Sequence, residues 1–248
     1  HGVALSVVLF GAMLVLARRP MAAPLGLGLV AAAASLHGLA HGAETPATGF
    51  AGYAIGFLVT TAALHIGGVA FDDHRFTFPE FAEVRKATPF GQVPTLDVDG
   101  TQFTQSDALL RFAGKLAGLY PTDPLQALYC DEVTYVVEEA GAKMGPTFRM
   151  SGEEQKAARL ALVNGSMPVY LGWLQQRLQA QGGEFFADGR LTVADLKVWV
   201  DVRALNSGRF DHVPTDLVER VAPALNAHMQ RIGETPAIKA YYAQFAAK

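Results

Sequence analysis

The uneven distribution of charge along the chain limits its possible folds more than any other feature. Only three of the 20 basic and 23 acidic residues lie within residues 1–70, and these are Arg18, Arg19 and Glu44. Residues 71–248 carry charge at the density of an ordinary soluble domain. We therefore expect two parts that meet different solvents, first a bilayer and then water.

The first part contains three apolar segments, at residues 3–17, 25–43 and 50–70. The last two approach the roughly 20 residues that span a bilayer core. Arg18 and Arg19 lie between the first two segments, whereas the connection 44–49 has no Lys or Arg. The positive-inside bias then places Arg18 and Arg19 in the cytoplasm. This pattern predicts about three transmembrane helices, the third of which returns the chain to the cytoplasm.

Polar residues inside these segments indicate a possible metal site. His37, His41 and Glu44 have the spacing that puts them on one helical face. His65, in the third segment, could complete a set of three imidazoles and one carboxylate, which suits nickel, cobalt or zinc. Alternatively, these side chains form hydrogen bonds between helices or lie near the membrane interface. Because ionisable groups at membrane depth are costly, the metal site is our working hypothesis.

The same residues carry a family resemblance. The run from His37 to Glu44 reads HGLAHGAE, and it is followed by Tyr53–Phe57 and Leu64-His65. It resembles the C-terminal half of the HupE/UreJ nickel permeases. The resemblance implies nickel or cobalt as the metal and residues 1–70 as a fragment, because the N-terminal helices of that family are absent from this sequence.

The second part changes from strand to helix signals. Residues 69–76, 92–98 and 101–103 are predicted strands, and Asp99-Gly100 is a two-residue hairpin signal. Helical periodicity begins at Gln105 and continues beyond a proline-containing linker at 120–124. The predicted fold class is therefore α+β, with a small sheet domain followed by an all-α domain.

Three cap signals help to place the later helices. Ser151 is expected to begin one helix, Thr192 and Asp195 form a capping pair, and Thr235 precedes Pro236. Among the remaining polar residues, Cys130 is expected in the core. The isolated histidines are expected at the surface or at helix caps, and they are His74, His212 and His228.

Three motifs in the second part resemble the sigma, alpha, mu and pi group of cytosolic glutathione transferases. They are Pro89–Leu96 (PFGQVPTL), Gln105-Ser106-Asp107 and the capping segment 189–196. The resemblance covers 71–248. It implies a thioredoxin-like domain at 71–119 that lacks its first strand and helix, and a helical transferase domain at 120–248.

The resemblance also implies how glutathione binds. Pro94 would follow a cis peptide bond, which turns Val93 so that its backbone pairs with the tripeptide. Gln92 precedes this turn, and Arg85 matches the basic contact to the glycyl carboxylate. A tryptophan that usually contributes nearby is missing, since only Phe78 and Phe81 are available here.

The γ-glutamyl end would bind at the start of a helix. There Ser106 and the free backbone N–H groups favour a carboxylate, and Gln105 adds an amide contact. Glu138 occupies the position from which the family reaches across a homodimer to the amino group of the ligand. The second substrate would be a small electrophile.

The residue that activates the thiol is not recognisable. The family uses a hydroxyl, usually a tyrosine, to generate the thiolate nucleophile. Tyr53 is the only tyrosine upstream of the sheet, but the residues after it do not resemble the family. The apolar stretch 54–66 is an alternative occupant for the place of the missing first helix, which would leave an unpaired sheet edge. We expect low transferase activity.

Three interpretations remain open. The chain is a membrane-anchored transferase of impaired activity, or a nickel/cobalt permease fragment with a soluble tail, or a gene-model or assembly chimera joined near Leu64–Gly68. In the last case the transferase would simply be cytoplasmic. The net charge of −3 and the lack of a basic stripe argue against nucleic acid as a partner. A single cysteine excludes an internal disulfide.

Overall fold

The computed structural model describes residues 58–246. The chain divides into two compact units, 1–49 and 50–248, so the described residues all belong to the second unit. Residues 58–66 are helical, and the elements that follow are α4 (Phe78–Val84), β1 (Leu96–Val98), β2 (Thr101–Phe103), α5 (Ser106–Leu116), α6 (Pro124–Met144), α7 (Gly152–Asn164), α8 (Ser166–Ala180), α9 (Val193–Asn206), α10 (Leu217–Val221), α11 (Pro223–Gly233) and α12 (Pro236–Ala246). The predicted order of a small sheet followed by helices is confirmed.

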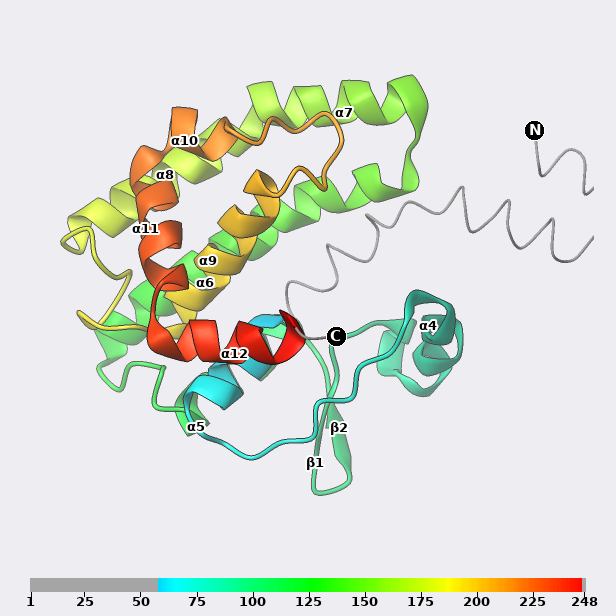
Figure 1. Ribbon diagram of the computed structural model, residues 1–248, viewed down its shortest axis with the longest axis vertical. Coiled ribbons are helices and arrows are strands. Elements are labelled where there is room, and N and C mark those ends of the chain that lie inside the picture. Colours follow the sequence, from blue (N-terminus) through cyan, green and yellow to red (C-terminus); the bar gives the residue numbers. More distant parts are fainter. Residues whose placement is uncertain (1–57, 247–248) are drawn as a thin grey trace, which may run out of the picture. The chain divides into compact units, whose positions relative to one another are not determined.

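The sheet is a single antiparallel hairpin. Leu96 pairs with Phe103 and Val98 with Thr101, while Asp99 and Gly100 have φ values of 52° and 80°. Left-handed backbone at both central positions is the geometry of a type I′ turn, which the Asp-Gly pair predicts. The hairpin and α4 lie to one side of the helical bundle (Figure 1).

Two of the predicted strands differ from the structure. Residues 69–77 have no regular structure, so the strand predicted at 69–76 is wrong. The strand predicted at 92–98 is shortened to Leu96–Val98. A strand needs a neighbour to satisfy its backbone groups, and within 58–246 only β1 and β2 pair. Residues 69–76 therefore belong to no sheet in the described part of the chain.

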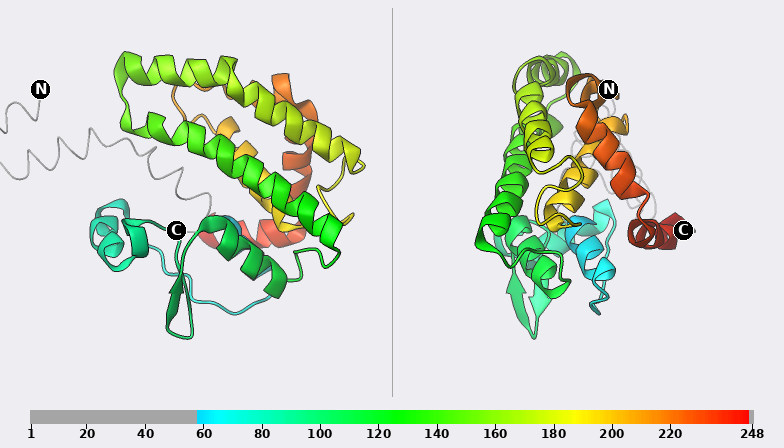
Figure 2. Two further views of the ribbon diagram at one scale, coloured as in Figure 1. Left: turned by 180° about the vertical axis from the view of Figure 1, so that it is seen from behind. Right: turned by 90° about the vertical axis from the view of Figure 1, so that its left-hand side faces the viewer.

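The helical part is built around α9. Helices α6 and α11 both contact α9, and α8 packs on α6 and α11; α6 and α8 run side by side in both views of Figure 2. All eight side chains from Val193 to Val200 are buried. The predicted capping pair is present at Thr192, where α9 begins, and α12 begins at Pro236 as predicted. The Thr235 hydroxyl does not cap α12, since it donates to the Ile232 carbonyl, and Ser151 begins α7 without a side-chain hydrogen bond.

Helix 58–66 belongs to the core of the same unit. Its residues 59–64 are all buried, and Val59, Ala63 and Leu64 join the apolar cluster that contains α5, α9 and α12 side chains. The Thr61 hydroxyl is 2.6 Å from the Tyr241 hydroxyl of α12. This placement agrees with the alternative in which 54–66 packs within the transferase part.

The predicted membrane segments remain predictions. Residues 3–17, 25–43 and the start of 50–70 lie outside the described residues. Among the helices at 58–246, none combines the length and the apolar character that a bilayer crossing requires.

Candidate functional site

The start of α5 has an unusual backbone. Gln105, the residue before the helix, has φ 75° and ψ 106°, and its carbonyl accepts the Leu109 N–H at 3.0 Å. No side chain caps α5, so its first N–H groups have no such partner from the described part of the chain. A non-glycine residue in this region is strained, and such residues concentrate at binding sites. The first turn of α5 is therefore a candidate anion site.

The loop before β1 brings further predicted residues together. The Val93–Pro94 peptide is cis, as predicted, and Phe90 and Gly91 have φ values of 62° and 60°. A side-chain carbon at Gly91 would lie 3.5 Å from Nε and Nη2 of Arg85, so the Arg85 guanidinium lies beside this loop. Arg85 and Gln92 are both exposed and can reach a ligand from water.

Charged side chains gather behind the first turn of α5. The Ser106 hydroxyl is 3.4 Å from Oε2 of Glu138 on α6. The Lys197 Nζ on α9 lies 2.8 Å from the same oxygen and 2.5 Å from Oδ1 of Asp107. The Lys197 side chain is only 3% exposed, whereas that of Glu138 is 53% exposed. Glu138 thus presents a carboxylate to solvent beside Ser106.

The carboxylates of this cluster outnumber Lys197, and the charge of Arg111, which also acts on Asp107, is balanced by Asp131. Burial raises the pKa of Asp107 despite the opposing charge of Lys197. Burial likewise raises the pKa of Asp201, one turn further along α9, to about 7, with Lys197 opposing and Glu138 adding to the shift. When all three carboxylates are ionised the cluster is net negative, which favours an ammonium group nearby. The site can therefore accept both ends of an amino acid, with the carboxylate at the α5 N–H groups and the amine near Glu138.

Three members of the cluster were not predicted as site residues: Asp107, Lys197 and Asp201. The available signal was Lys197, which lies in the apolar run Leu196–Val200 of α9. A lysine inside a buried helix requires a carboxylate partner. Ser106 was already a predicted site residue, and Asp107 directly follows it. Asp107 was therefore the first carboxylate to consider as the partner of Lys197.

Several predicted residues lie outside the described part of the chain. Tyr53, His37, His41 and Glu44 fall before residue 58, so the catalytic and metal predictions that rest on them are not tested. His65 is exposed, and its ring lies 5.3 Å from that of Tyr241. Residues 58–246 contain no group of three or more metal-ligating side chains.

Two other predictions are decided by burial. Cys130 is fully buried, as predicted, and burial raises the pKa of its thiol to about 12, so it is not a nucleophile. His228 was expected at the surface or at a cap, and this is wrong. It is fully buried, and its Nε2 lies 3.0 Å from Oδ1 of Asp195. The partner of His228 lies 33 residues away in the sequence, so local spacing could not reveal it.

Family comparisons match both parts of the chain. A family model described as HupE / UreJ protein matches residues 1–84. A second, described as the C-terminal domain of glutathione S-transferase, matches residues 142–244. The first match extends beyond residue 70 and includes helix 58–66, which packs in the core of the second unit.

Individual relatives agree with the second match. Glutathione S-transferase S1 of Drosophila melanogaster is 30% identical over 71% of this chain and 68% of its own length. Glutathione S-transferase 2 of Manduca sexta is 28% identical over 75% of this chain and 90% of its own. Among solved structures, prostaglandin synthase D of Nilaparvata lugens is 25% identical with a TM-score of 0.68, covering 76% of this chain and 92% of that one. The glutathione S-transferase of Ascaris lumbricoides is 27% identical with a TM-score of 0.62, covering 75% and 90%.

Proposed function

The chain belongs to the glutathione transferase family, fused to a HupE/UreJ segment, and from this premise we propose that it binds glutathione at the start of α5. The domain boundaries we propose are 71–119 for the glutathione-binding domain and 120–248 for the helical domain. The reaction we propose is conjugation of the glutathione thiol to a small electrophile.

The observation that carries this proposal is the strained Gln105 next to Ser106. Its φ is 75°, no side chain caps the first N–H groups of α5, and Ser106 is the first residue of that helix. The γ-glutamyl carboxylate of glutathione fits these donors. Its amino group fits the exposed carboxylate of Glu138. Gln92 and Val93 lie on the loop that would hold the rest of the tripeptide, and the Arg85 guanidinium lies beside this loop.

Replacing Ser106 with alanine tests the proposed binding site. We expect glutathione affinity to fall by about 1–3 kcal/mol, because a charged carboxylate loses a hydrogen-bond partner. Isothermal titration calorimetry measures this directly. Ser151→Ala is the matched control, since Ser151 also begins a helix without a side-chain cap. Unchanged affinity in Ser106→Ala, or an equal loss in both variants, would remove Ser106 from the site.

We further propose that conjugation by this chain is slow. The proposal rests on the sequence, in which Tyr53 is the only tyrosine before the sheet. A thiol near its usual pKa of about 8.5 is only a few per cent ionised at pH 7. Loss of activation should therefore lower turnover more than binding.

The turnover of an aromatic electrophile by this chain should lie well below that of a version with a restored first strand and helix. Equal turnover would show that a replacement activator exists. Tyr53→Phe then tests whether the replacement is Tyr53.

The soluble part is proposed to form a homodimer. Large apolar side chains remain exposed on β2, α5 and α6, namely Phe103, Phe112, Leu128 and Tyr135. Burying such side chains is the usual driving force of association. Sedimentation velocity in detergent should give twice the chain mass, and a purely monomeric species would contradict the dimer.

For the part of residues 1–70 that precedes helix 58–66 we propose a membrane anchor that carries a metal site, with the transferase part in the cytoplasm. The HupE/UreJ match over 1–84 favours this reading. His37, His41, Glu44 and His65 would bind nickel or cobalt. Replacing His41 should reduce binding of Ni²⁺ to the detergent-solubilised chain more than replacing His74, which is exposed in the soluble part. Equal losses would indicate nonspecific binding by histidine.

A further inference from the structure

The junction between α7 and α8 contains the only Asn-Gly pair in the sequence, Asn164-Gly165. The two helices follow each other end to end (Figure 2), and Gly165 alone separates them. Its φ of −121° and ψ of −97° interrupt the helical backbone. A side-chain carbon at Gly165 would lie 2.7 Å from the Ala161 carbonyl oxygen, so a side chain does not fit here unless the backbone shifts.

The Asn164 side chain is placed to react with the residue that follows it. Asn164 and Gly165 are both exposed, and the Asn164 amide forms no hydrogen bond with any residue in the described part of the chain. The backbone nitrogen after an asparagine can attack the side-chain amide carbon, because a succinimide ring then forms. Glycine in the second position favours the attack, since no Cβ crowds its nitrogen and its backbone is the most adaptable.

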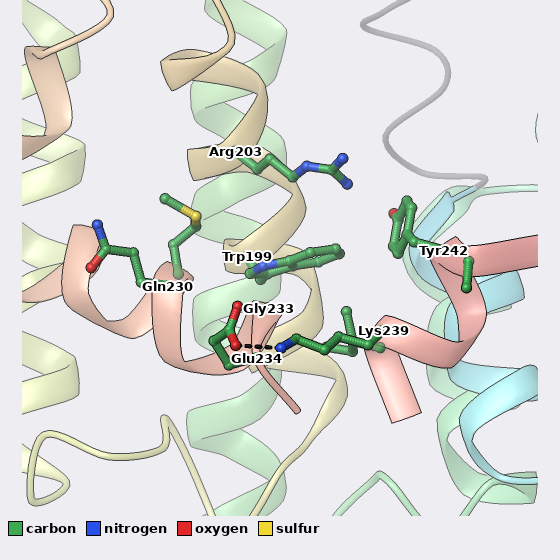
Figure 3. A pocket seen from close by; sticks show the side chains of 10 residues that line it. Trp199, Arg203, Gln230, Gly233, Glu234, Lys239 and Tyr242 are labelled. Atoms are coloured by element: carbon green, nitrogen blue, oxygen red, sulfur yellow. Dashed lines mark hydrogen bonds and ion pairs between the residues drawn. The ribbon is translucent and has the colours of Figure 1, made fainter. Parts of the chain in front are cut away.

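The other two asparagines of the chain, Asn206 and Asn226, provide an internal comparison. They lie on α9 and α11, two of the helices around the cleft drawn in Figure 3. Asn206 Nδ2 donates to Asn226 Oδ1 at 2.8 Å, and Asn226 Nδ2 donates to Oε2 of Glu219. Serine follows Asn206 and alanine follows Asn226. Both amides are therefore held by hydrogen bonds, and both are followed by a residue that has a Cβ.

Asn206 also matches Asn164 in its backbone. Each is the last residue of its helix. The nitrogen of the next residue, Gly165 or Ser207, is 3.2 Å from the carbonyl oxygen three residues before it. This hydrogen bond has to open before the nitrogen can attack, and bonds at helix ends open most easily. The two positions therefore differ in the side chain and in the residue that follows, and not in backbone hydrogen bonding.

We propose that Asn164 is a site of spontaneous deamidation. The Gly165 nitrogen forms a bond to the side-chain amide carbon of Asn164, and the amide nitrogen leaves as ammonia with the proton from Gly165. Water then opens the succinimide at either carbonyl, which gives aspartate or isoaspartate. Water is the only co-reactant, and the proposal does not depend on glutathione binding at α5.

The reaction changes the junction in two ways. Either product adds a negative charge between two helix ends, where it is unfavourable for the end of α7 and favourable for the start of α8. Isoaspartate also lengthens the main chain by one carbon. Val163 and Met167 on either side of the junction are buried, so a longer main chain has to displace at least one of them from the core.

Peptide mass spectrometry of the full chain, kept in detergent at mildly alkaline pH, tests the proposal. The peptide with residue 164 should gain the mass of the aspartate form at least about tenfold faster than the peptides with residues 206 and 226, because only its amide and nitrogen are unrestrained. Asn164→Gln is the control, and it should remove this change without affecting the other two peptides. Equal rates at the three native asparagines would overturn the proposal.

Two further measurements separate the fold from the Asn-Gly sequence. In urea the native contacts are lost, and folding should slow the reaction at Asn164 by less than about tenfold relative to urea. Ser207→Gly turns Asn206 into a second Asn-Gly pair, which should still react at least about tenfold more slowly than Asn164 because Asn226 holds its amide. If Asn164 reacts in urea but stays intact in the folded chain, or if both Asn-Gly pairs of the variant react equally fast, the fold does not select Asn164 and the inference is wrong.

Discussion

Two capping boxes in this chain have the same local geometry and very different surroundings. At α4, Glu80 Oε2 accepts the Thr77 N–H at 2.6 Å and its hydroxyl at 2.8 Å. At α9, Asp195 Oδ2 accepts the Thr192 N–H and hydroxyl, both at 2.8 Å. The first box is exposed, whereas both residues of the second are fully buried. One sequence signal therefore starts two helices whose contributions to stability should differ.

The same contrast separates the two halves of the described chain. From residue 70 to residue 108 no side chain that the structure describes is fully buried, while eight consecutive ones are buried at the start of α9. Regions with little buried apolar surface open most easily. The loop that carries Arg85, Gln92 and Val93 belongs to the poorly buried half. We therefore expect this segment to open more easily than the helical half.

The largest predicted effect comes from the buried capping box. Asp195→Ala removes the α9 cap and also leaves the Phe186 N–H and His228 without their shared acceptor, Oδ1. We expect a loss of about 3–5 kcal/mol in the free energy of unfolding, the range for breaking a buried charged network. Urea denaturation measures the loss.

Glu80→Ala is the matched change in the exposed box. Its denaturation midpoint should move far less, because water replaces the lost hydrogen bonds. Equal midpoint shifts in the two variants would show that burial adds nothing to the contribution of a capping box, since the capping hydrogen bonds alone would then account for both shifts.

The second effect concerns the link between the two halves. Lys197 joins α9 to Asp107 on α5 and to Glu138 on α6. Lys197→Met should lower the free energy of unfolding by about 2–3 kcal/mol. This is less than the loss on breaking a fully buried ion pair, because Asp107 can take up a proton once Lys197 is gone. Lys156→Met is the control, as its pair with Glu153 is exposed. A double variant with Asp107→Asn should recover part of the loss in urea denaturation, and no recovery would show that Lys197 contributes through packing alone.

Local signals predicted those elements whose cause is local. The Asp99-Gly100 turn, the start of α5 after Gln105 and the cap at Thr192 each depend on residues a few positions apart. They could be read from the sequence because backbone hydrogen bonding and left-handed φ values act over that range.

What the sequence missed depends on distant partners. Residues 69–76 have the composition of a strand, but a strand forms only when another strand pairs with it. Lys197 and His228 were not recognised because their partners come from other helices. Helix 58–66 has the composition of a membrane span, yet residues 59–64 pack in the protein core, where apolar side chains are equally favoured. Composition could not distinguish these two environments.

The smallest predicted effect is a dependence of stability on pH through Asp201. Its pKa is raised to about 7 in the folded chain, against about 3.9 when unfolded. The folded chain therefore binds more protons between these values, and stability should fall as pH rises from about 4 to about 7. Below this window the carboxyl is protonated in both states, and above it the full cost of the buried charge is present.

Asp201→Asn removes this titration while keeping the shape of the side chain. Because solvent reaches part of Asp201, we discount the shift and expect the unfolding free energy of the unmodified chain, relative to the variant, to fall by about 1–2 kcal/mol between pH 5 and pH 8. Asp216→Asn is the control, since Asp216 pairs with Arg220 at the surface. If the difference between the unmodified chain and Asp201→Asn stays constant with pH, Asp201 is ionised in the folded state throughout this range. Lys197 would then compensate the buried carboxylate fully, and the cluster behind α5 would carry one negative charge more at pH 5 than we infer.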